Sequence, residues 1–522
     1  MIYRQASVAV WLCLLPQLGA CAESDFLSFD ELTALSTTAA PQGKLSERLH
    51  HLLSTPIVEN GASAQGIQPH RPTEGTLGPI VRAAFWNIER GLNFEFIQAG
   101  LAGPERFRQE LDRAEEPAGK FAAATPQLQR LQNADIVVLN EVDLGMKRTE
   151  YRHVARDLAA GLQMNYAYGV EFVEVDRLLD LGLEEVEAPD KNVEERLRED
   201  LKIDRGRYRG LHGNAILSRY PIRRARILRL PDCYDWYGQE MEAIAKLEQG
   251  KRWAASTVFR ERIAREVRQG GRMALIADLS VPGSPTGEVT VVSAHLENRC
   301  EPRCRQRQTD ALLAALAEVS NPVVLAGDFN TSGGNATPTS VRNEIMKRVR
   351  DYRFWIEQAI SWFTPASIPR YALLPARYLH GYLDPTALHV PFVWKNRERG
   401  LFDRIGKFRF ADGYAFDFRG ETERTIGPRA RTLANSNQRG AKGFIPTYAF
   451  ERDFGGLFGR FKLDWFLVKP SIRDAWRNGQ AYRFAPHFAL TMRELNESVA
   501  DRISDHPPLT VDLPLDEPPA GN

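Results

Sequence analysis

The sequence predicts a large α/β fold, and two observations lead to that expectation. Short runs of Val, Ile, Leu and Ala recur from about residue 80 to residue 513, bounded by turn residues. Near-continuous apolar runs of this length are typical of strands buried on both faces of a sheet. Helical patterns lie between the runs. In residues 307–319, for example, Leu312, Leu313 and Leu316 share one stripe, as a helix packed on a sheet requires.

The chain begins with a segment typical of an export signal. Arg4 precedes an apolar run from Ala6 to Leu15, which is too short to span a bilayer, and small residues follow. The sequence Leu18-Gly19-Ala20-Cys21 also resembles a bacterial lipobox, in which the cysteine receives a lipid. We therefore expect residues 1–21 to be a signal peptide, of the lipoprotein type if Cys21 is lipidated. The protein would then be an outer-membrane lipoprotein, or periplasmic or secreted. The alternative is a buried apolar helix.

Three further regions are predicted along the chain. Residues 22–75 are rich in Ser, Thr, Ala, Gly and Pro, which favours a flexible lead-in. One catalytic domain is expected over residues 76–515, with two insertions. Residues 174–209 are dense in charge, and residues 332–460 are rich in aromatic residues and Arg, so we expect the second insertion to pack on the core. The predicted strands are Ile80–Trp86, Ile136–Leu139, Ala215–Leu217, Ala274–Leu279, Val289–Ala294, Val323–Ala326, Leu463–Val468 and Leu509–Leu513.

Composition and charge exclude few classes of protein. The 522 residues are 43% hydrophobic and 26% charged, with a formal net charge of +1, so no global field points to nucleic acid or a membrane. Any attraction of a charged substrate must be local. One local cluster is better explained as a solvated strand edge than as a nucleic-acid track. Its members are Arg219, Arg223, Arg224, Arg226 and Arg229.

Two of the five cysteines, Cys13 and Cys21, belong to the predicted signal, and Cys233 stands alone. Cys300 and Cys304 flank the tripeptide Glu-Pro-Arg. In an oxidising compartment this pair is expected to close a small disulfide loop, because a zinc site would need further ligands at suitable spacing.

Polar residues follow or precede many of the predicted strands. Any one of them alone would be an ordinary turn residue, but side chains at one edge of a sheet can converge from distant sequence positions. The set comprises Asn87, Glu141, His295, Asp328, Asn330, Asp464, Asp505 and His506.

Carboxylates, amides and imidazoles in this combination suit the attack of water on a phosphoester. A hard cation such as Mg²⁺ prefers oxygen ligands, which assigns Glu141 to the metal, with Asn87 and Asp505 in support. Asp328 is the candidate to orient or deprotonate the water, and Asn330 would hold the water or a phosphate oxygen. His506, held by Asp464, would act as a base or an electrostatic clamp, and His295 would donate to a phosphate oxygen or to the leaving group.

The order of these motifs resembles that of the endonuclease/exonuclease/phosphatase superfamily, which includes deoxyribonuclease I, abasic-site endonucleases, neutral sphingomyelinases and inositol polyphosphate 5-phosphatases. Seven motifs in the family's order make the resemblance specific, although the two insertions match nothing recognisable. The segments that carry it are Phe85-Trp86-Asn87-Ile88-Glu89-Arg90-Gly91, Leu139-Asn140-Glu141-Val142, residues 213–221 (GNAILSRYP), Ser293-Ala294-His295-Leu296-Glu297, Gly327-Asp328-Phe329-Asn330, Lys462-Leu463-Asp464-Trp465 and Ser504-Asp505-His506.

The resemblance implies a deoxyribonuclease I-like fold, a four-layer sandwich of two mixed β-sheets flanked by helices. It also implies Mg²⁺ or Mn²⁺ and the catalytic roles given above. Neither a DNA-binding loop of the nucleases nor the β-hairpin of the sphingomyelinases is recognisable. The basic segment 298–308 after His295 favours a polyanion. We therefore expect a phosphodiesterase acting on nucleic acid.

Two alternatives stay open. A sphingomyelinase-like or phosphoinositide-type enzyme would act on a phospholipid head group, and a membrane tether through Cys21 would suit it. The other alternative is a catalytically silent binding module on the same fold. No protein partner is predicted.

Overall fold

The computed structural model describes residues 26–73, 79–175, 203–242, 267–332, 385–386, 396–418, 433–440, 443–449, 460–470, 489–500 and 502–514. The predicted signal peptide with Cys21 lies outside these residues, as do 176–202 of the first predicted insertion and much of the second. No helix within the described ranges is both long and apolar enough to cross a bilayer.

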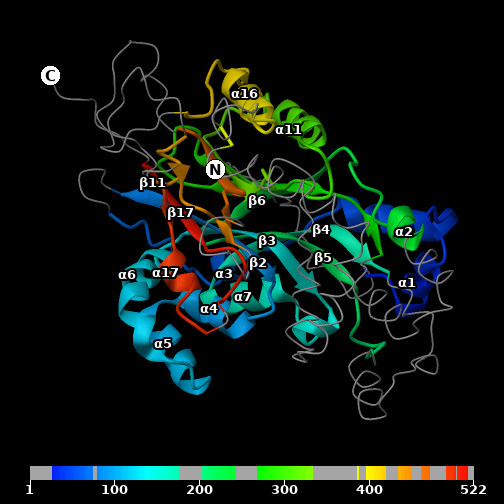
Figure 1. Ribbon diagram of the computed structural model, residues 1–522, viewed down its shortest axis with the longest axis horizontal. Coiled ribbons are helices and arrows are strands. Elements are labelled where there is room, and N and C mark those ends of the chain that lie inside the picture. The colour runs from blue at the N-terminus through cyan, green and yellow to red at the C-terminus, as the bar shows by residue number, and fades with distance from the viewer. Residues whose placement is uncertain are drawn as a thin grey trace, which may run out of the picture.

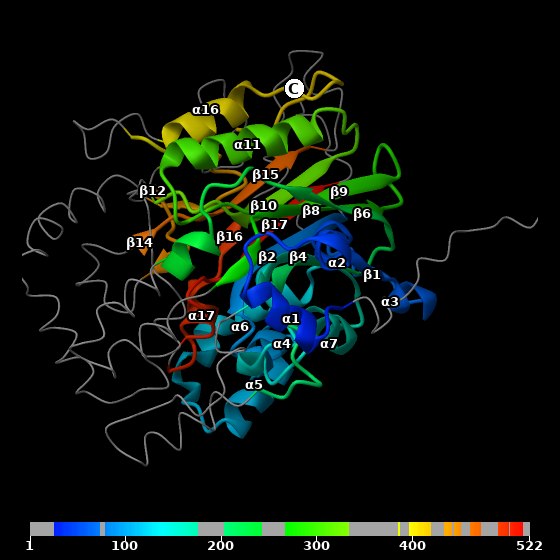
Figure 2. The same cartoon turned by 90° about the vertical axis from the view of Figure 1, so that its right-hand side faces the viewer.

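Two mixed β-sheets stack face to face, and helices cover their outer faces, giving four layers (Figures 1 and 2). The first sheet has the order β1 (Ile57–Glu59), β4 (Asn165–Glu174), β5 (Leu211–Ser218), β3 (Ile136–Leu144), β2 (Ile80–Arg90), β17 (Leu509–Pro514) and β16 (Leu490–Thr491), with β7 (Arg268–Gly270) paired to β4. The second has the order β15 (Asp464–Lys469), β10 (Val323–Asp328), β9 (Glu288–His295), β8 (Met273–Ser280) and β6 (Ile222–Arg229). The predicted four-layer sandwich is confirmed.

The alternation of side chains along the strands builds two cores on either side of the first sheet. In β2, Val81, Ala83 and Phe85 point between the sheets, while Ala84 and Trp86 point toward the helices. Phe85 meets Phe466 of β15 with ring centres 6.4 Å apart. Both faces of β2 are therefore buried, which explains why its sequence is a continuous apolar run instead of an alternating one.

Helices cover both outer faces. The first sheet carries α4 (Phe94–Ala102), α5 (Pro104–Arg113), α6 (Phe121–Gln132) and α7 (Val154–Leu162), and the second carries α11 (Pro302–Leu316) and α16 (Arg399–Lys407) (Figure 2). The predicted helix over 307–319 corresponds to α11. This helix starts earlier than predicted because Pro302 occupies its first turn, where a missing N–H costs nothing.

Residues 22–75 were expected to be a flexible lead-in, but their described part consists of packed helices and a strand. That part forms α1 (Phe29–Ser36), α2 (Gly43–Ser54), β1 and the short α3 (Gly61–Ala64). Leu32 and Leu35 of α1 are fully buried in the core that faces the helices, and β1 pairs with β4. Ser28 caps α1 in a capping box with Glu31. Small and polar residues here mark caps and short connections between packed elements, which composition alone could not distinguish from a tether.

The second predicted insertion packs on the core in its described part, as expected. Leu401, Phe402 and Ile405 of α16 are buried in the same apolar cluster as Trp465 of β15. The rings of Phe402 and Trp465 lie 4.6 Å apart. The same region and its continuation supply two small two-stranded sheets, β11 (Arg439–Gly440) with β12 (Gly443–Phe444) and β13 (Tyr448–Ala449) with β14 (Arg460–Phe461). The short remaining elements are η3 (Ala118–Lys120), η4 (Lys147–Thr149) and α17 (Arg493–Asn496).

Candidate active site

Irregular strand pairing brings Asn87 and Glu141 to the centre of the site. Both were expected to follow strand ends, but β2 and β3 run past them to Arg90 and Leu144, and the β2–β3 pairing shifts register there. Glu141 has a positive φ of 54°, a conformation that an ordinary residue adopts only at a cost. Such a bulge turns a side chain out of the regular alternation. The Asn87 amide thereby lies 3.3 Å from the Glu141 carboxylate.

Asp328 ends β10 beside these two residues. Its carboxylate accepts a hydrogen bond from the Asn87 amide at 3.4 Å and another from the backbone N–H of Asn330 at 2.9 Å. Asn330, at a positive φ of 49°, donates its own amide to the carbonyl of Leu296. The backbone N–H of Asp328 donates to the side chain of the buried Asn140 at 2.9 Å. Asp328 is thus held from both sheets.

His506 reaches the site from the loop before β17. Its Nδ1 lies 2.7 Å from Asp464 Oδ2, and its Nε2 lies 3.9 Å from Asp328 Oδ2. Two contacts fix the loop that carries it: Ser504 donates to the carbonyl of Asn87, and the Trp86 indole donates to the carbonyl of His506. The distant motifs therefore hold one another by direct hydrogen bonds.

His295 ends β9 on the other side of Asp328, with Nε2 3.8 Å from the Asp328 carboxylate. Two residues that the sequence did not single out surround it. Glu171 of β4 lies 3.5 Å from His295 Nδ1, and the Arg272 guanidinium lies 2.9 Å from the same ring nitrogen and 3.0 Å from Glu171. All three side chains are buried.

One pocket collects most of the predicted site. Glu141, His295, Asp328, Asn330, Asp505 and His506 line it, whereas Asn87 and Asp464 contact these residues from behind. The remaining lining residues are Arg90, His212, Trp236, Arg268, Arg272, Asn298, Tyr448 and Leu463. Arg90 and Leu463 lie within the quoted motifs and Asn298 opens the basic segment, but none was assigned a role, and the others occur singly, outside any recognisable motif. Glu171 offered one usable signal, as an acidic residue inside an otherwise apolar strand.

Burial and neighbouring charge shift the pKa values of the pocket residues. Burial and the adjacent Asp464 raise the pKa of Asp328 to about 6, against the opposing effect of His506 and His295. Burial alone would lower the pKa of His506, but Asp464 and Asp505 raise it to about 10. For Glu141, burial would raise the pKa, yet the positive charges of His295 and its neighbours lower it overall. Such opposed shifts among close groups are typical of functional sites.

The donor set fits a hard divalent cation. Ligand atoms of Asp328, Asp464 and His506 all lie within 4.8 Å of one another. The Oδ1 atom of Asp464 is buried and has no hydrogen-bond partner among the described residues. A buried carboxylate oxygen without a partner is costly unless a cation satisfies it. This compact group adjoins the predicted ligands Asn87, Glu141 and Asp505, so either set of oxygens could hold the ion.

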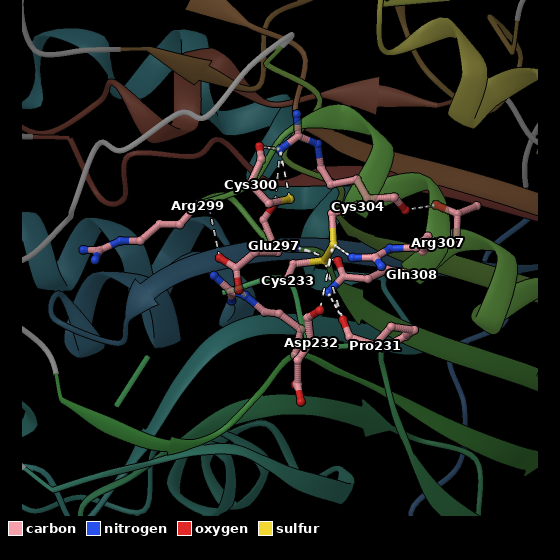
Figure 3. Close-up of a disulfide and its surroundings, with 12 residues drawn as sticks. Pro231, Asp232, Cys233, Glu297, Arg299, Cys300, Cys304, Arg307 and Gln308 are labelled. Carbon is pink, nitrogen blue, oxygen red and sulfur yellow. Dashed lines mark hydrogen bonds and ion pairs between the residues drawn. A yellow bond between two sulfur atoms is a disulfide. The ribbon is translucent and has the colours of Figure 1, made fainter. Parts of the chain in front are cut away.

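A disulfide joins the segment before Trp236 to α11, but it is not between the predicted cysteines. Cys233 pairs with Cys304, 71 residues apart, and the buried Cys300 is the free thiol among the described residues (Figure 3). Cys300 lies at the end of a loop, where its thiol donates to the carbonyl of Glu297. Cys304 lies in α11 and faces the segment that contains Cys233. Sequence proximity favoured the pair 300 and 304, and only the fold brings residue 233 near.

The model of the endonuclease/exonuclease/phosphatase family matches residues 84–506. A family protein from Beutenbergia cavernae is 15% identical, over 85% of this chain and 73% of that one, with a TM-score of 0.30. A 3′-5′ exonuclease from Neisseria meningitidis is 14% identical, over 83% and 99%, with a TM-score of 0.36.

An abasic-site (AP) endonuclease from Archaeoglobus fulgidus is 10% identical, over 83% of this chain and 98% of that one, with a TM-score of 0.34. No curated protein matches the chain. The family match spans every motif from Phe85 to His506. The chain belongs to the endonuclease/exonuclease/phosphatase family.

Proposed function

We propose that the protein is an exported, Mg²⁺- or Mn²⁺-dependent phosphodiesterase that acts on nucleic acid. One observation carries the proposal: Glu141, Asp328, His295 and His506, from four separate parts of the chain, line a single polar pocket. Members of this family hydrolyse phosphoester bonds, and the pocket holds the acid, amide and imidazole groups that such a reaction needs.

Each group has a role that its position supports. Glu141, Asn87 and Asp505 would hold the cation, which when bound offsets the charge of the phosphate. Asp328 would accept the proton of the attacking water, and Asn330 would orient that water or a phosphate oxygen. His506, fixed by Asp464, would contact a phosphate oxygen. His295, fixed by Glu171 and Arg272, would donate to the leaving oxygen on the opposite side.

The pocket's chemistry favours nucleic acid over a lipid substrate. Apart from Trp236, Tyr448 and Leu463, its described lining consists of charged, imidazole or amide side chains. A phosphate with polar substituents suits such a lining, whereas an acyl chain would find little apolar surface. Export and a lipid anchor at Cys21 remain part of the proposal on sequence grounds alone.

The first test is hydrolysis of bis(p-nitrophenyl) phosphate with Mg²⁺ or Mn²⁺. We expect turnover that a chelator abolishes and added metal restores. Glu141→Gln should lower kcat by about 10²–10⁴-fold, because the amide cannot replace the charge that a hard cation requires. An exposed carboxylate such as Glu494 gives the matched control, Glu494→Gln, with unchanged turnover. No chelator-sensitive turnover on any phosphoester would instead favour the binding module.

The second test compares plasmid DNA, RNA, sphingomyelin and phosphoinositide vesicles, with His506→Ala as the blank. Cleavage of DNA or RNA that weakens steeply with salt would support the proposal, because phosphate contacts release counterions. Cleavage of the vesicles alone would support the lipid enzyme instead.

A further inference from the structure

Glu297 is a buried acidic residue that the proposed reaction leaves without a role. It lies two residues after His295, is only 1% exposed and is not among the residues that line the described pocket. A carboxylate buried this deeply is costly unless hydrogen-bond donors or a cation surround it. The groups that surround Glu297 all belong to the part of the protein that holds His295.

Both carboxylate oxygens of Glu297 accept hydrogen bonds. Oε1 accepts the backbone N–H of Arg299 at 3.0 Å, and Oε2 accepts the indole N–H of Trp236 at 2.9 Å. The backbone N–H of Glu297 donates to the side chain of Gln308 in α11 at 2.9 Å (Figure 3). Because these partners come from three separate segments, the position of the carboxylate is fixed by the fold around it.

The same carboxylate holds one end of the Arg272 guanidinium. Its Oε2 lies 3.6 Å from Nε of Arg272, a residue that is only 4% exposed. Nη1 of Arg272 lies 3.0 Å from Glu171 and 2.9 Å from Nδ1 of His295. Nη2 lies 3.5 Å from the side-chain oxygen of Asn298. A guanidinium is planar and rigid, so groups facing all of its nitrogens restrict its rotation and fix Nη1 against the imidazole.

The charge of Glu297 matters because Arg272 is a buried cation. Burial would lower the pKa of Arg272, but the two carboxylates of Glu171 and Glu297 raise it overall. Glu171 also lies 3.5 Å from Nδ1 of His295, so it is shared between the arginine and the histidine. Without the charge of Glu297, Arg272 would depend on Glu171 alone. We expect the guanidinium then to move toward Glu171 and to displace the His295 ring that it contacts.

We propose that Glu297 is a positioning residue for the departure of the leaving group, acting through Arg272 on His295. The inference rests on the proposed function, in which water forms the new P–O bond and gives a proton to Asp328. The P–O bond to the leaving oxygen breaks, and that oxygen keeps the electron pair and takes a proton from His295. Both side chains then exchange protons with solvent. A misplaced His295 therefore slows the substrates whose leaving oxygen needs that proton.

The kinetic test compares two substrates that share thymidine 5′-phosphate and differ in the leaving group. Thymidylyl-(3′→5′)-thymidine releases a nucleoside hydroxyl, which must gain a proton, whereas the p-nitrophenyl ester of thymidine 5′-phosphate releases a stable anion. We expect Glu297→Gln to lower kcat on the dinucleotide by about tenfold to a hundredfold, with KM near that of wild type. On the nitrophenyl ester the loss should stay below about threefold.

Glu110→Gln is the matched control. Glu110 is also a buried carboxylate paired with an arginine, Arg113, but it lies in α5 and does not contact the pocket. This variant should hydrolyse both substrates as wild type does. Equal losses of kcat on the two substrates in Glu297→Gln would overturn the proposed role, because a general loss of folded protein does not depend on the leaving group.

Arg272→Lys tests whether Glu297 acts through Arg272. Lysine keeps the positive charge but lacks the fork that reaches Glu297, Glu171 and His295 together. Adding Glu297→Gln to Arg272→Lys should therefore lower kcat on the dinucleotide by less than about twofold further. If the two losses multiply in full, Glu297 does not act through Arg272 and the proposal is wrong.

A spectroscopic measurement separates this inference from the proposed function. In the full chain with ¹³C-labelled histidine rings, the NMR signal of His295 is the one that disappears in His295→Gln. Glu297→Gln should move this signal, and Glu110→Gln should leave it in place. If neither thymidine substrate is hydrolysed but the signal moves, the proposed function fails and the placement of His295 by Glu297 stands. An unmoved signal in Glu297→Gln would refute that placement, whatever the activity.

Discussion

At the scale of single residues, Asp464 positions His506 from behind the pocket. It contributes no surface to the pocket, and its Oδ2 lies 2.7 Å from His506 Nδ1 with both groups buried. Replacement by Asn keeps the size but removes the charge that orients the ring and stabilises its positive form. We expect Asp464→Asn to lower kcat by about 10²–10⁴-fold, the usual worth of a positioned acid–base group. Steady-state kinetics on bis(p-nitrophenyl) phosphate would measure it.

The control for this change is Asp310→Asn, because Asp310 pairs with Arg404 on the exposed surface of α11. It removes the same charge without touching the pocket, and its kcat should equal that of wild type. If Asp464→Asn keeps kcat within about twofold of wild type, His506 works without its carboxylate partner and the assigned role of Asp464 is wrong.

His153 makes a separate prediction about stability and pH. It caps α7 by accepting the backbone N–H of Arg156, and burial, aided by Arg156, lowers its pKa to about 3. The unfolded imidazole titrates near 6.5, so below that pH only the unfolded chain takes up the proton. Above pH 6.5 His153 is neutral in both states and costs the fold no stability. Below that pH its contribution lowers the free energy of unfolding steadily as the pH drops toward 3. The loss is about 1.4 kcal/mol per pH unit.

The measurement is urea unfolding of wild type and His153→Asn at pH 7 and pH 5. Asn can still accept the cap hydrogen bond but does not titrate. The other histidines titrate equally in both proteins and cancel in the comparison. From pH 7 to pH 5, the free energy of unfolding of wild type should fall by about 2 kcal/mol more than that of the variant. Equal losses would mean that His153 is protonated in the folded protein.

The site could be predicted from the sequence where its residues stand in ordered motifs. Motifs reveal residues that follow recognisable runs, such as Asp328 and Asn330 in Gly-Asp-Phe-Asn, and the structure places them in one pocket. Glu171 and His212 lie inside strands, Arg272 lies between β7 and β8, and none of the three belongs to a recognisable motif. Their closeness to His295 and Glu141 depends on strand order, β4 beside β5 and β8 beside β9, which the sequence does not contain.

At the scale of elements, the disulfide joins two segments that shape the pocket wall. Cys233 lies three residues before Trp236, whose indole donates to Glu297, and Cys304 lies in α11. A link between residues 71 apart removes enough freedom from the unfolded chain to stabilise the fold by about 4 kcal/mol. We expect reductant to lower the melting temperature of wild type. Cys233→Ser should already have this lowered melting temperature without reductant, and reductant should not change it.

Cys300→Ser is the matched control, because it removes a buried sulfur but leaves the disulfide intact. It should stay sensitive to reductant. Peptide mapping without reduction should also recover residues 233 and 304 in one linked fragment. The opposite pattern, with Cys300→Ser insensitive to reductant and Cys233→Ser still sensitive, would restore the pairing of Cys300 with Cys304 that the sequence favoured.

The strands show where sequence patterns succeed and fail. All eight predicted strands are present, because each is largely apolar and almost entirely buried. β4 was missed because Asn165, Gly169 and Glu171 interrupt its apolar run, although nearly all of the strand is buried. β6 was missed as a full strand because Arg223, Arg224 and Arg226 face solvent at the edge of the second sheet. These three form the expected solvated strand edge, whereas Arg219 precedes the strand and is buried, and Arg229 donates to backbone carbonyls.

At the scale of the whole molecule, the active site depends on how the two sheets are joined. Asn140 of β3 is fully buried and makes the connection. Its amide donates to Asn214 of the same sheet at 2.9 Å and to Ser293 of the other sheet at 3.0 Å. Its oxygen accepts the backbone N–H of Asp328, also from the other sheet. One side chain thus fixes the distance between Glu141, its neighbour in β3, and Asp328.

Asn140→Ala should therefore lower kcat by more than its cost in stability explains. Leaving the Asp328 N–H unpaired costs about 1–3 kcal/mol, and a shift of Asp328 by about 1 Å lowers kcat by about a hundredfold. Asn165→Ala is the matched control. Asn165 is another buried asparagine with several hydrogen bonds, but it lies at the far end of β4. Asn165→Ala should lower the melting temperature about as much as Asn140→Ala does, while its kcat stays near that of wild type. If both variants lose kcat in proportion to stability, the sheets are held in register by their apolar core and Asn140 has no special part in placing the catalytic groups.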